Sequence, residues 1–169
     1  MDEAAQEWDG GIVLRSGLIP GAARALRRIR GQGHRIALVA DAEVKSMENV
    51  YRQHKLEDCF DAQIISETLG ASKPDPAMFR AAMDALGLSE ADKGRVIMVG
   101  NNLRRDIPGA NRFGIVSVWI DWSPRYFREP REQDEIPDYT IHSPDELPPL
   151  MERLEEALGR GESIKKLFR

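Results

Sequence analysis

Short apolar runs alternate with amphipathic helical segments along most of this chain. The runs have the length of buried strands and lack the strict alternation of a strand with one exposed face. They cover residues 34–39, 62–65, 95–99, 115–120 and 138–141. Helical patterns fill most of the intervals, and the first of them opens at Pro20-Gly21, whereas residues 121–137 form a long polar loop. The alternation predicts an α/β domain of Rossmann-like type, with three α/β/α layers and a mostly parallel sheet.

Length and charge narrow the class of protein further. A chain of 169 residues suits one domain of ordinary size with a sizeable core. It holds 24 basic and 28 acidic residues, for a net charge of −4, which argues against a nucleic-acid surface. The apolar runs are far too short for a membrane span, and the acidic start has no secretory pattern. With its single cysteine, Cys59, the composition predicts a soluble cytoplasmic domain.

The chain divides into three parts. Residues 1–17 show no strong period and are interpreted as a linker or the remnant of a cap domain, although Ile12 to Leu14 could form a short strand. Residues 18–159 form the predicted core, and residues 160–169 form a basic C-terminal tail. No intact cap domain is expected.

Polar side chains follow several of the predicted strands. In open parallel sheets the functional groups lie beyond the carboxyl ends of the strands. The segments expected at that edge are Ala40-Asp41, Ser66 to Lys73, Gly100 to Asp106, and Asp121. We expect these segments to meet in space.

Three segments resemble the core of the haloacid dehalogenase-like hydrolases, in the order and spacing of that family. They are PGAARALRRIRGQGHRIALVAD, SKPDPAMFRAAMDALG and VGNNLRRDIPGANRFG. The similarity extends over roughly residues 18–147. It implies a fold with a central parallel sheet and, by ancestry, Mg²⁺-dependent hydrolysis of a phosphate ester through a phospho-aspartyl intermediate. A small phosphorylated molecule is then the expected ligand.

The match is incomplete when the family's functional residues are carried over one at a time. Lys73 corresponds to the lysine that offsets charge on the nucleophile and the phosphate. Ala40 lies where a phosphoryl-binding Ser or Thr is usual, and Asp41 follows it, so Ala40, Asp41 and Lys73 are the candidate phosphate-binding residues. Asn101 stands at the first metal-binding acidic position and Asp106 matches the second. Because an amide brings no charge, the resemblance implies weak Mg²⁺ binding or none.

The nucleophile motif of the family is missing. Only 20 residues precede Gly21, and no D-x-D-x-T pattern occurs among them. We therefore expect the chain to be inactive or weakly active in this form. The segment EWDGG, residues 7–11, resembles the motif loosely but follows no strand pattern.

The loss has a structural side. In the family the nucleophile strand lies between the strands assigned here to 34–39 and 95–99, so two strand edges lose their partner. Four solutions remain open: Ile12 to Leu14 fills the position, a partner chain or a second copy supplies a strand, the two edges close together, or the chain is part of a longer protein.

Two further interpretations compete with the inactive hydrolase. The chain could be a non-catalytic module that binds a phosphorylated ligand or a protein. Alternatively, the chain could be a working phosphatase that uses Asp41 or a strand supplied by another chain. In the first case Asp41 would be the nucleophile and Glu43 its acid and base, because Asp41-x-Glu43 follows an apolar strand. Lys73 and Asp41 are thus the candidate catalytic residues.

Overall fold

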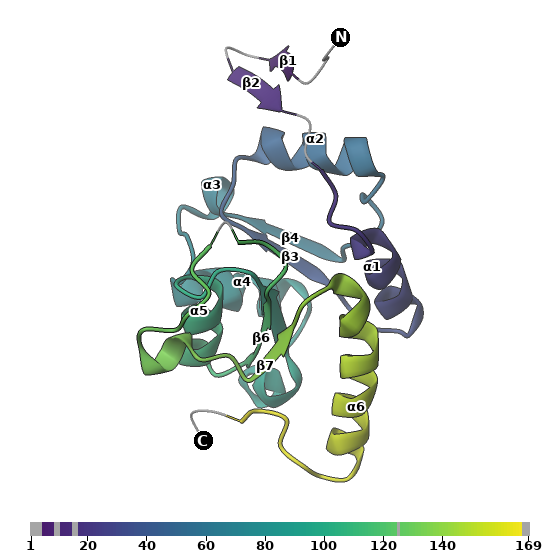
Figure 1. The fold of residues 1–169 in the computed structure, drawn as a ribbon, viewed down its shortest axis with the longest axis vertical. Helices are drawn as coiled ribbons and strands as arrows, with labels where there is room; N and C mark the ends of the chain where they lie inside the picture. Colours follow the sequence, from purple (N-terminus) through teal and green to yellow (C-terminus); the bar gives the residue numbers. More distant parts are fainter. Residues whose placement is uncertain (1–4, 9–10, 15–16, 125, 167–169) are drawn as a thin grey trace.

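Parallel strands with helices on both faces form the body of the protein in a computed structural model of the chain (Figure 1). The structure describes residues 5–8, 11–14, 17–124 and 126–166; for the first two of these ranges it describes only the backbone. The strands of the body are β3 (Ala37–Ala40), β4 (Ala62–Ile65), β5 (Ile97–Gly100), β6 (Val116–Ile120) and β7 (Tyr139–Ile141). The α/β class predicted from the sequence is confirmed.

Six helices cover the strands, with three short 3₁₀ turns between them, in the part of the chain that is described. The helices are α1 (Ala22–Gly31), α2 (Val44–His54), α3 (Ser66–Leu69), α4 (Pro76–Ala85), α5 (Asp106–Phe113) and α6 (Leu147–Gly159). The 3₁₀ turns are Glu90–Arg95, Gln133–Glu135 and Pro144–Glu146. Local signals explain several boundaries. Asp75 caps α4 by accepting a hydrogen bond from the Ala77 N–H, and Pro76 occupies the first turn, where a missing N–H costs nothing.

The strand boundaries differ slightly from the sequence prediction. β3 begins at Ala37 rather than at residue 34, because the Ile36 N–H bonds to the Asp61 carboxylate, 2.8 Å away, before the ladder with β4 begins. β5 begins two residues later than predicted, at Ile97, and ends one residue later, at Gly100. β4 has the predicted bounds.

The parallel strands fall into two separate sheets. β3 pairs with β4, with Ala37 opposite Ala62 and Ala40 opposite Ile65. β5, β6 and β7 form the second sheet, with Ile97 opposite Val116. Among the described strands, no ladder joins β3 to β5. The alternative in which these two edges close on each other is therefore wrong for the described strands.

The candidate strand Ile12 to Leu14 belongs to β2 (Gly11–Leu14). It pairs antiparallel with β1 (Ala5–Trp8), and Figure 1 shows this hairpin standing away from the body. In this structure β2 therefore does not lie between β3 and β5. The EWDGG segment lies partly outside the described residues.

One apolar cluster joins the two sheets on the α4 and α5 face. Its buried members are Met78, Phe79, Met83, Ala110, Phe113 and Ile115, and side chains from both sheets pack against it, including Val39, Ile64 and Met98. Gly109 allows the close contact between the helices, because a Cβ at this position would lie 2.5 Å from the Phe79 ring. This shared cluster holds the two sheets in one body.

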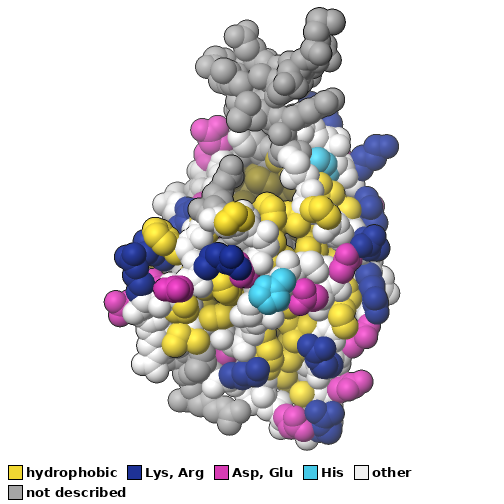
Figure 2. Space-filling view, in the orientation of Figure 1, with side chains coloured by type: hydrophobic (Ala, Val, Ile, Leu, Met, Phe, Trp, Pro, Cys, Tyr) yellow, Lys and Arg dark blue, Asp and Glu magenta, His cyan; other side chains and the backbone are white. Residues whose placement is uncertain are grey.

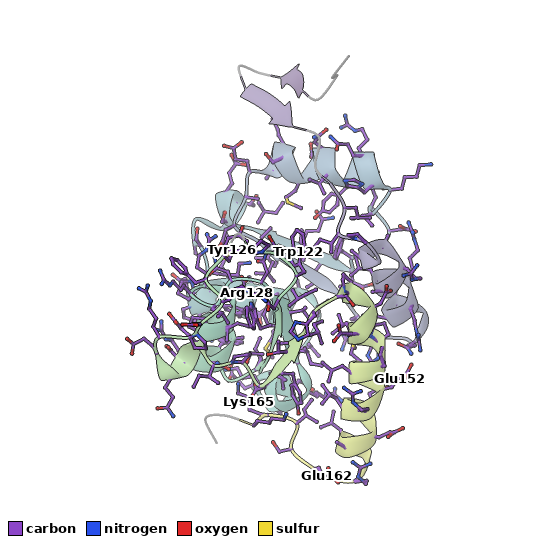
Figure 3. All side chains as sticks on the ribbon, in the orientation of Figure 1. Trp122, Tyr126, Arg128, Glu152, Glu162 and Lys165 are labelled. Carbon is purple, nitrogen blue, oxygen red and sulfur yellow. The ribbon has the colours of Figure 1, made fainter. Side chains whose placement is uncertain are left out.

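The opposite face has two clusters instead of one. Tyr51, Leu56 and Cys59 form the first, with Leu38 of β3 packed against it. β6, β7, α6 and Ile164 form the second, with Ile97 and Val99 of β5 packed against it. Surface ion pairs connect α1 to α6 along this face: Arg28 bonds to Glu152 at 2.8 Å, and Arg24 bonds to Asp145 at 2.6 Å just before α6. Figure 3 labels Glu152 on α6.

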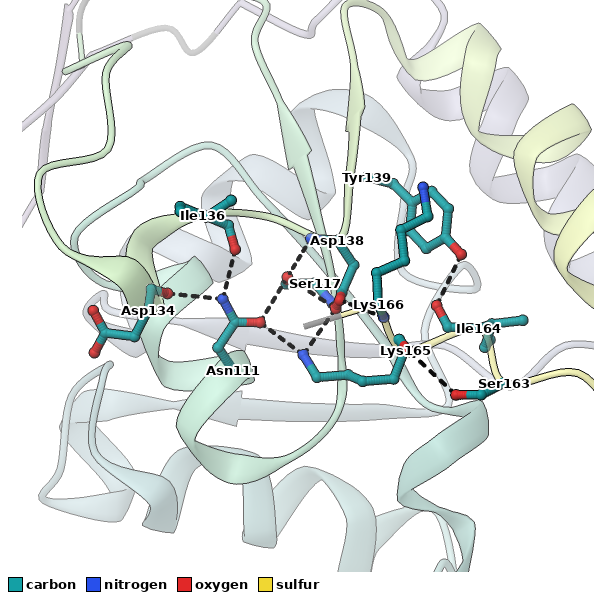
Figure 4. Close-up of polar contacts among 10 residues, drawn as sticks. All are labelled: Asn111, Ser117, Asp134, Ile136, Asp138, Tyr139, Ser163, Ile164, Lys165 and Lys166. Carbon is teal, nitrogen blue, oxygen red and sulfur yellow. Dashed lines mark hydrogen bonds and ion pairs between the residues drawn. The ribbon is translucent and has the colours of Figure 1, made fainter. Parts of the chain in front are cut away.

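Residues 163–166 pack against the body. Ile164 is 2% exposed and accepts a hydrogen bond from the Tyr139 hydroxyl through its carbonyl oxygen. The Lys165 ammonium donates to Asn111 at 2.7 Å and to Asp138 at 2.8 Å, as Figure 4 shows. The Ser117 hydroxyl also bonds to the side-chain oxygens of Asn111 and Asp138. The four side chains therefore form one buried hydrogen-bond network beside β6 and β7. Within the predicted basic tail, Ile164 and Lys165 are therefore buried and have a structural role.

Candidate functional site

The carboxyl ends of the parallel strands meet at one edge of the body, which we call the crest. It consists of residues 40–44 after β3, 66–73 after β4, 100–106 after β5 and 121–124 after β6. Hydrogen bonds and an ion pair connect the first three of these loops directly. The sequence prediction that these segments lie together is supported by those contacts.

Lys73 occupies the centre of the crest. Its ammonium nitrogen Nζ lies 2.9 Å from Oδ1 of Asp106 and donates to the Val39 carbonyl oxygen at 2.8 Å. The Lys73 and Asp106 side chains are only 10% and 7% exposed. The Lys73 ammonium is thus held between β3 and α5, where it is almost inaccessible to solvent.

Asp41 lies directly beside Lys73 in this arrangement. Its Oδ1 accepts a hydrogen bond from the Lys73 backbone N–H at 2.9 Å, and its Oδ2 forms an ion pair with Arg105 at 3.2 Å. The carboxylate is 13% exposed. Both oxygens therefore already have donors. Ala40, the residue before it, ends β3 opposite Ile65 and contributes backbone only.

Asp106 stabilises the turn that leads into α5. Its Oδ2 accepts a hydrogen bond from the Asn102 N–H at 2.9 Å, and its place on the first turn of the helix favours a negative charge. The carboxylate packs against Gly100 so closely that a Cβ there would lie 2.5 Å or less from it. Only glycine fits at the end of β5 without displacing Asp106.

The two asparagines of the crest have structural partners. The Asn102 amide oxygen accepts a hydrogen bond from the Arg104 N–H at 2.9 Å, as short polar side chains often do in turns. The Asn101 carbonyl oxygen accepts one from the indole nitrogen of Trp119 at 3.2 Å. Through these bonds both residues stabilise the conformation of the loop after β5.

The donor set at the crest does not fit a strong magnesium site. Mg²⁺ prefers charged carboxylate oxygens and water. Here the one carboxylate at the candidate metal position, Asp106, is neutralised by Lys73, and Asn101 offers an uncharged amide. Over the described ranges, no group of three or more His, Cys, Asp or Glu side chains could hold a metal ion.

Arg105 and Ser66 lie in segments that the sequence placed at the crest, but the sequence assigned neither residue a role. Arg105 pairs with Asp41 across 64 positions of sequence, and nothing local indicates that partner. The Ser66 hydroxyl accepts a hydrogen bond from the Ala42 N–H at 3.0 Å, while Glu67 accepts one from Val44 at the start of α2. A hydroxyl is thus present at the crest, on the loop after β4 and not at Ala40, where the family has a Ser or Thr.

A shallow hollow of about 520 Å³ opens beside these groups. It is lined by Asp41, Ala42, Glu43, Ser66, Glu67, Gly70, Ala71 and Ser72. Its polar walls come from the loops after β3 and β4. Glu43, the candidate acid and base, lies in this wall.

The loop after β6 brings aromatic side chains to the crest. The Arg104 guanidinium lies 3.3 Å from the centroid of the Phe127 ring, and its Nη2 is buried without a hydrogen-bond partner in the described structure. Asp121 at the end of β6 forms an ion pair with Arg128 at 2.5 Å. Figure 3 labels Trp122, Tyr126 and Arg128 in this loop.

The sequence and the fold are similar to those of known proteins. The sequence matches the haloacid dehalogenase-like hydrolases over residues 2–114, so the chain belongs to that family. The resemblance drawn from the KPDP and VGNNLRRD segments is confirmed.

Two of the similar proteins are named as a phosphatase and a nucleotidase. The chain is 33% identical over 147 residues to a glyceraldehyde 3-phosphate phosphatase of Pyrococcus furiosus, which covers 86% of this chain and 58% of the relative. It is 31% identical over 135 residues to a pyrimidine 5'-nucleotidase of Escherichia coli, covering 79% of this chain and 56% of the relative. The chain thus spans somewhat more than half the length of these relatives.

A solved structure gives the same result for the fold. The crystal structure of a phosphatase of this family from Thermococcus onnurineus superposes with a TM-score of 0.66 at 26% sequence identity. The alignment covers 78% of this chain and 57% of that one. No helix in the described parts of the chain is long and apolar enough to cross a membrane.

Proposed function

We propose that this chain carries the phosphoryl-binding part of a phosphate-ester hydrolase and that alone it turns over slowly or not at all. The observation that carries the proposal is the Lys73 ammonium, which is almost buried and is fixed between the Val39 carbonyl oxygen and the Asp106 carboxylate at the crest. A fixed cation in a water-poor position stabilises the charge of a phosphoryl group far better than a solvated one.

We expect low turnover because the oxygens of the Asp41 and Asp106 carboxylates already accept hydrogen bonds or form ion pairs. A carboxylate nucleophile must present an oxygen to the phosphorus atom. Asp41 has a donor on each oxygen, and so has Asp106. Ala40 offers no hydroxyl to orient the phosphoryl group. The crest can therefore bind charge, but it lacks an obvious attacking group.

The proposed substrate class is a small phosphate monoester. The names of the relatives, a glyceraldehyde 3-phosphate phosphatase and a pyrimidine 5'-nucleotidase, support that class. The polar hollow of about 520 Å³ beside Asp41 has room for a compact phosphorylated molecule. We propose a cytoplasmic setting, in keeping with a small metabolite as ligand.

We also propose that Mg²⁺ binds weakly to this chain alone. The support is the donor set, in which Lys73 already neutralises Asp106 and Asn101 brings no charge. Titration calorimetry of the chain with MgCl₂ should give no saturable heat at millimolar concentrations, and Asp106→Asn should leave the trace unchanged. Saturable binding that Asp106→Asn removes would contradict this proposal.

The test of the main proposal is hydrolysis of p-nitrophenyl phosphate by the purified chain with Mg²⁺ present. We expect turnover close to the buffer rate from protein shown to be folded by circular dichroism. We also expect p-nitrophenyl phosphate or inorganic phosphate to bind, and Lys73→Met to weaken that binding by about tenfold or more, as for a charge-assisted hydrogen bond.

Asp41 provides the second candidate function, that of a working phosphatase. Its position beside Lys73, with Glu43 in the adjoining hollow, favours it specifically. Turnover by the chain that Asp41→Asn abolishes would make Asp41 the nucleophile. Absent turnover together with absent phosphate binding would leave a module that recognises a protein partner.

A further inference from the structure

A second cavity lies between α4 and α5, on the face where one apolar cluster joins the two sheets. Its volume is about 500 Å³, which is in the range of small-molecule sites. It shares no lining residue with the hollow beside Asp41. We call it the α4–α5 groove, and it is lined by Pro74, Asp75, Pro76, Arg80, Lys93, Gly109, Arg112 and Phe113.

Three cations line this groove, against a single carboxylate. The cations are Arg80, Lys93 and Arg112, and the carboxylate belongs to Asp75. Asp75 is already engaged at the start of α4, where its Oδ1 accepts a hydrogen bond from the Ala77 N–H at 2.8 Å. The balance of charge along the walls therefore attracts anions.

Arg80 is the cation without an acceptor. Its side chain is exposed, its Cζ lies 6.0 Å from the centroid of the Phe113 ring, and among the described residues it has no hydrogen-bond or ion-pair partner. The face of the body in Figure 2 differs, because basic and acidic side chains lie next to each other over much of it. A guanidinium has five N–H donors, so Arg80 can offer a paired set to an anion.

Lys93 lies over the same aromatic ring. Its Nζ is 3.9 Å from the Phe113 centroid and 2.7 Å from Oε2 of Glu90. The Glu90 side chain is 71% exposed, and a pair of this kind contributes little, so a ligand anion can replace it. Two cations within 6.0 Å of one ring centroid also repel each other, and an anion between them removes that repulsion.

Arg112 supplies the third cation of the groove. Its Nε and Nη2 contact the Asp134 carboxylate, which leaves the donors of Nη1 for a ligand. The remaining side chains of the lining, those of Pro74, Pro76 and Phe113, are apolar. A ligand that fits therefore carries several negative groups on a compact apolar skeleton.

From these contacts we propose that the α4–α5 groove binds a small organic anion with two or more carboxylate or phosphate groups. Guanidinium groups suit both chemistries, because their paired N–H donors match two oxygens of one anionic group. Arg80 binds one group, and Lys93 and Arg112 bind the others. The site lies outside the crest and goes beyond the proposed function, on which it does not depend.

The first test is calorimetric titration of the full chain with trimesate, a planar aromatic tricarboxylate. We expect saturable binding at millimolar concentration, and Arg80→Gln should weaken it by about tenfold or more, as for a charge-assisted hydrogen bond. Arg153→Gln is the matched control, because Arg153 of α6 is also exposed and has no ion pair in the described parts of the chain. The control should bind like the unaltered chain. Absent saturation, or equal affinities for the two variants, would overturn the proposal.

Two further probes separate charge from apolar contact. Benzoate keeps the ring of trimesate but has one carboxylate, and citrate keeps the number of carboxylates but has no ring. Trimesate should bind about tenfold or more tightly than benzoate, because each lost carboxylate removes a charge-assisted hydrogen bond. It should also bind more tightly than citrate, by a smaller factor. Benzoate binding as tightly as trimesate would overturn the need for several charges, and citrate binding more tightly would overturn the role of the apolar wall.

The location of binding separates this proposal from the proposed function. In nitrogen–proton NMR spectra, trimesate should shift the amide signals of residues 77–80 and 109–113, whereas inorganic phosphate should shift those of residues 41–44 and 70–72. Lys73→Met should weaken phosphate binding and leave trimesate binding unchanged. Trimesate binding that shifts only the crest and is lost in Lys73→Met would overturn the groove site. Trimesate shifts in the groove, with no phosphate binding at the crest, would support the groove site and count against the proposed function.

Discussion

The Lys73 ammonium and the Asp106 carboxylate lie 2.9 Å apart, and both side chains are almost removed from solvent. The pair joins the loop before α4 to the first turn of α5, and Lys73 also holds the end of β3. A buried pair of this kind contributes little net stability compared with apolar residues, but breaking it leaves one charge without a partner. The crest therefore depends on both residues.

Removal of one partner should be costly. Lys73→Met keeps the length of the side chain but leaves Asp106 charged and buried, and we expect a loss of about 3 kcal/mol in the free energy of unfolding. Asp106→Asn should cost less, because an amide oxygen can still accept from the Asn102 N–H. Urea denaturation measures both.

The double variant Lys73→Met/Asp106→Asn is the control for this coupling. It should be more stable than the sum of the single losses predicts, since the residues are in contact. Strictly additive losses would mean that the two charges do not interact in the folded protein.

Gly100 should not tolerate a side chain. A Cβ at this position would lie 2.3 Å from the Asp106 Cβ, so Gly100→Ala must displace either β5 or the carboxylate. We expect a loss of about 1–3 kcal/mol or more, as for overpacking in a core. Gly94→Ala is the matched control, because nothing lies within 4 Å of its Cβ and the change should stay within about 0.5 kcal/mol. Thermal or urea unfolding of the two variants measures these losses. Similar losses of unfolding free energy for both variants would be evidence against the close contact between Gly100 and Asp106.

The elements of this fold were largely predictable from sequence, because their signals are local. The periodic apolar positions of α1, the Asp75-Pro76 start of α4 and the apolar run of β4 indicate their own structure. The separation of β3 from β5 was among the alternatives that the resemblance to the family suggested, and no ladder joins these two strands in the described part of the chain. Which alternative holds could not be decided from the sequence, since it depends on packing between residues far apart in sequence.

The sequence predicted where the candidate site lies in the fold, but it did not predict which side chains contact each other there. Lys73, Asp41 and Asp106 do meet at the crest, as strand ends in a parallel sheet must. The pairing of Arg105 with Asp41 and of Lys73 with the Val39 carbonyl is set by the tertiary fold alone. The same holds for Lys165, whose partners lie 54 and 27 positions away.

Lys165 should be important for stability, in contrast to its neighbour. Its ammonium lies against the fully buried Asp138 carboxylate, at 2.8 Å, so Lys165→Met should cost about 3–5 kcal/mol. Lys166 is exposed and lies 3.9 Å from the Tyr139 ring, so Lys166→Met should cost about 1 kcal/mol or less. Unfolding in urea tests this contrast. Equal and small effects would show that residues 163–166 are not held by the buried network.

Tyr51 should make the protein sensitive to alkali. Burial raises the pKa of its phenol from 10.0 to about 12, and its hydroxyl has no hydrogen-bond partner in the described structure. The neutral phenol is favoured in the folded state, so this contribution to stability is complete below pH 10 and is lost as the pH rises from 10 to 12. Tyr51→Phe removes an unsatisfied polar group, and at pH 8 it should be neutral or slightly stabilising. The difference in unfolding free energy between Tyr51→Phe and the unaltered chain should then grow in favour of the variant from pH 10 to 12. Stability measured in urea across that range tests the prediction, and a constant difference would show that Tyr51 ionises alike in the folded and unfolded states.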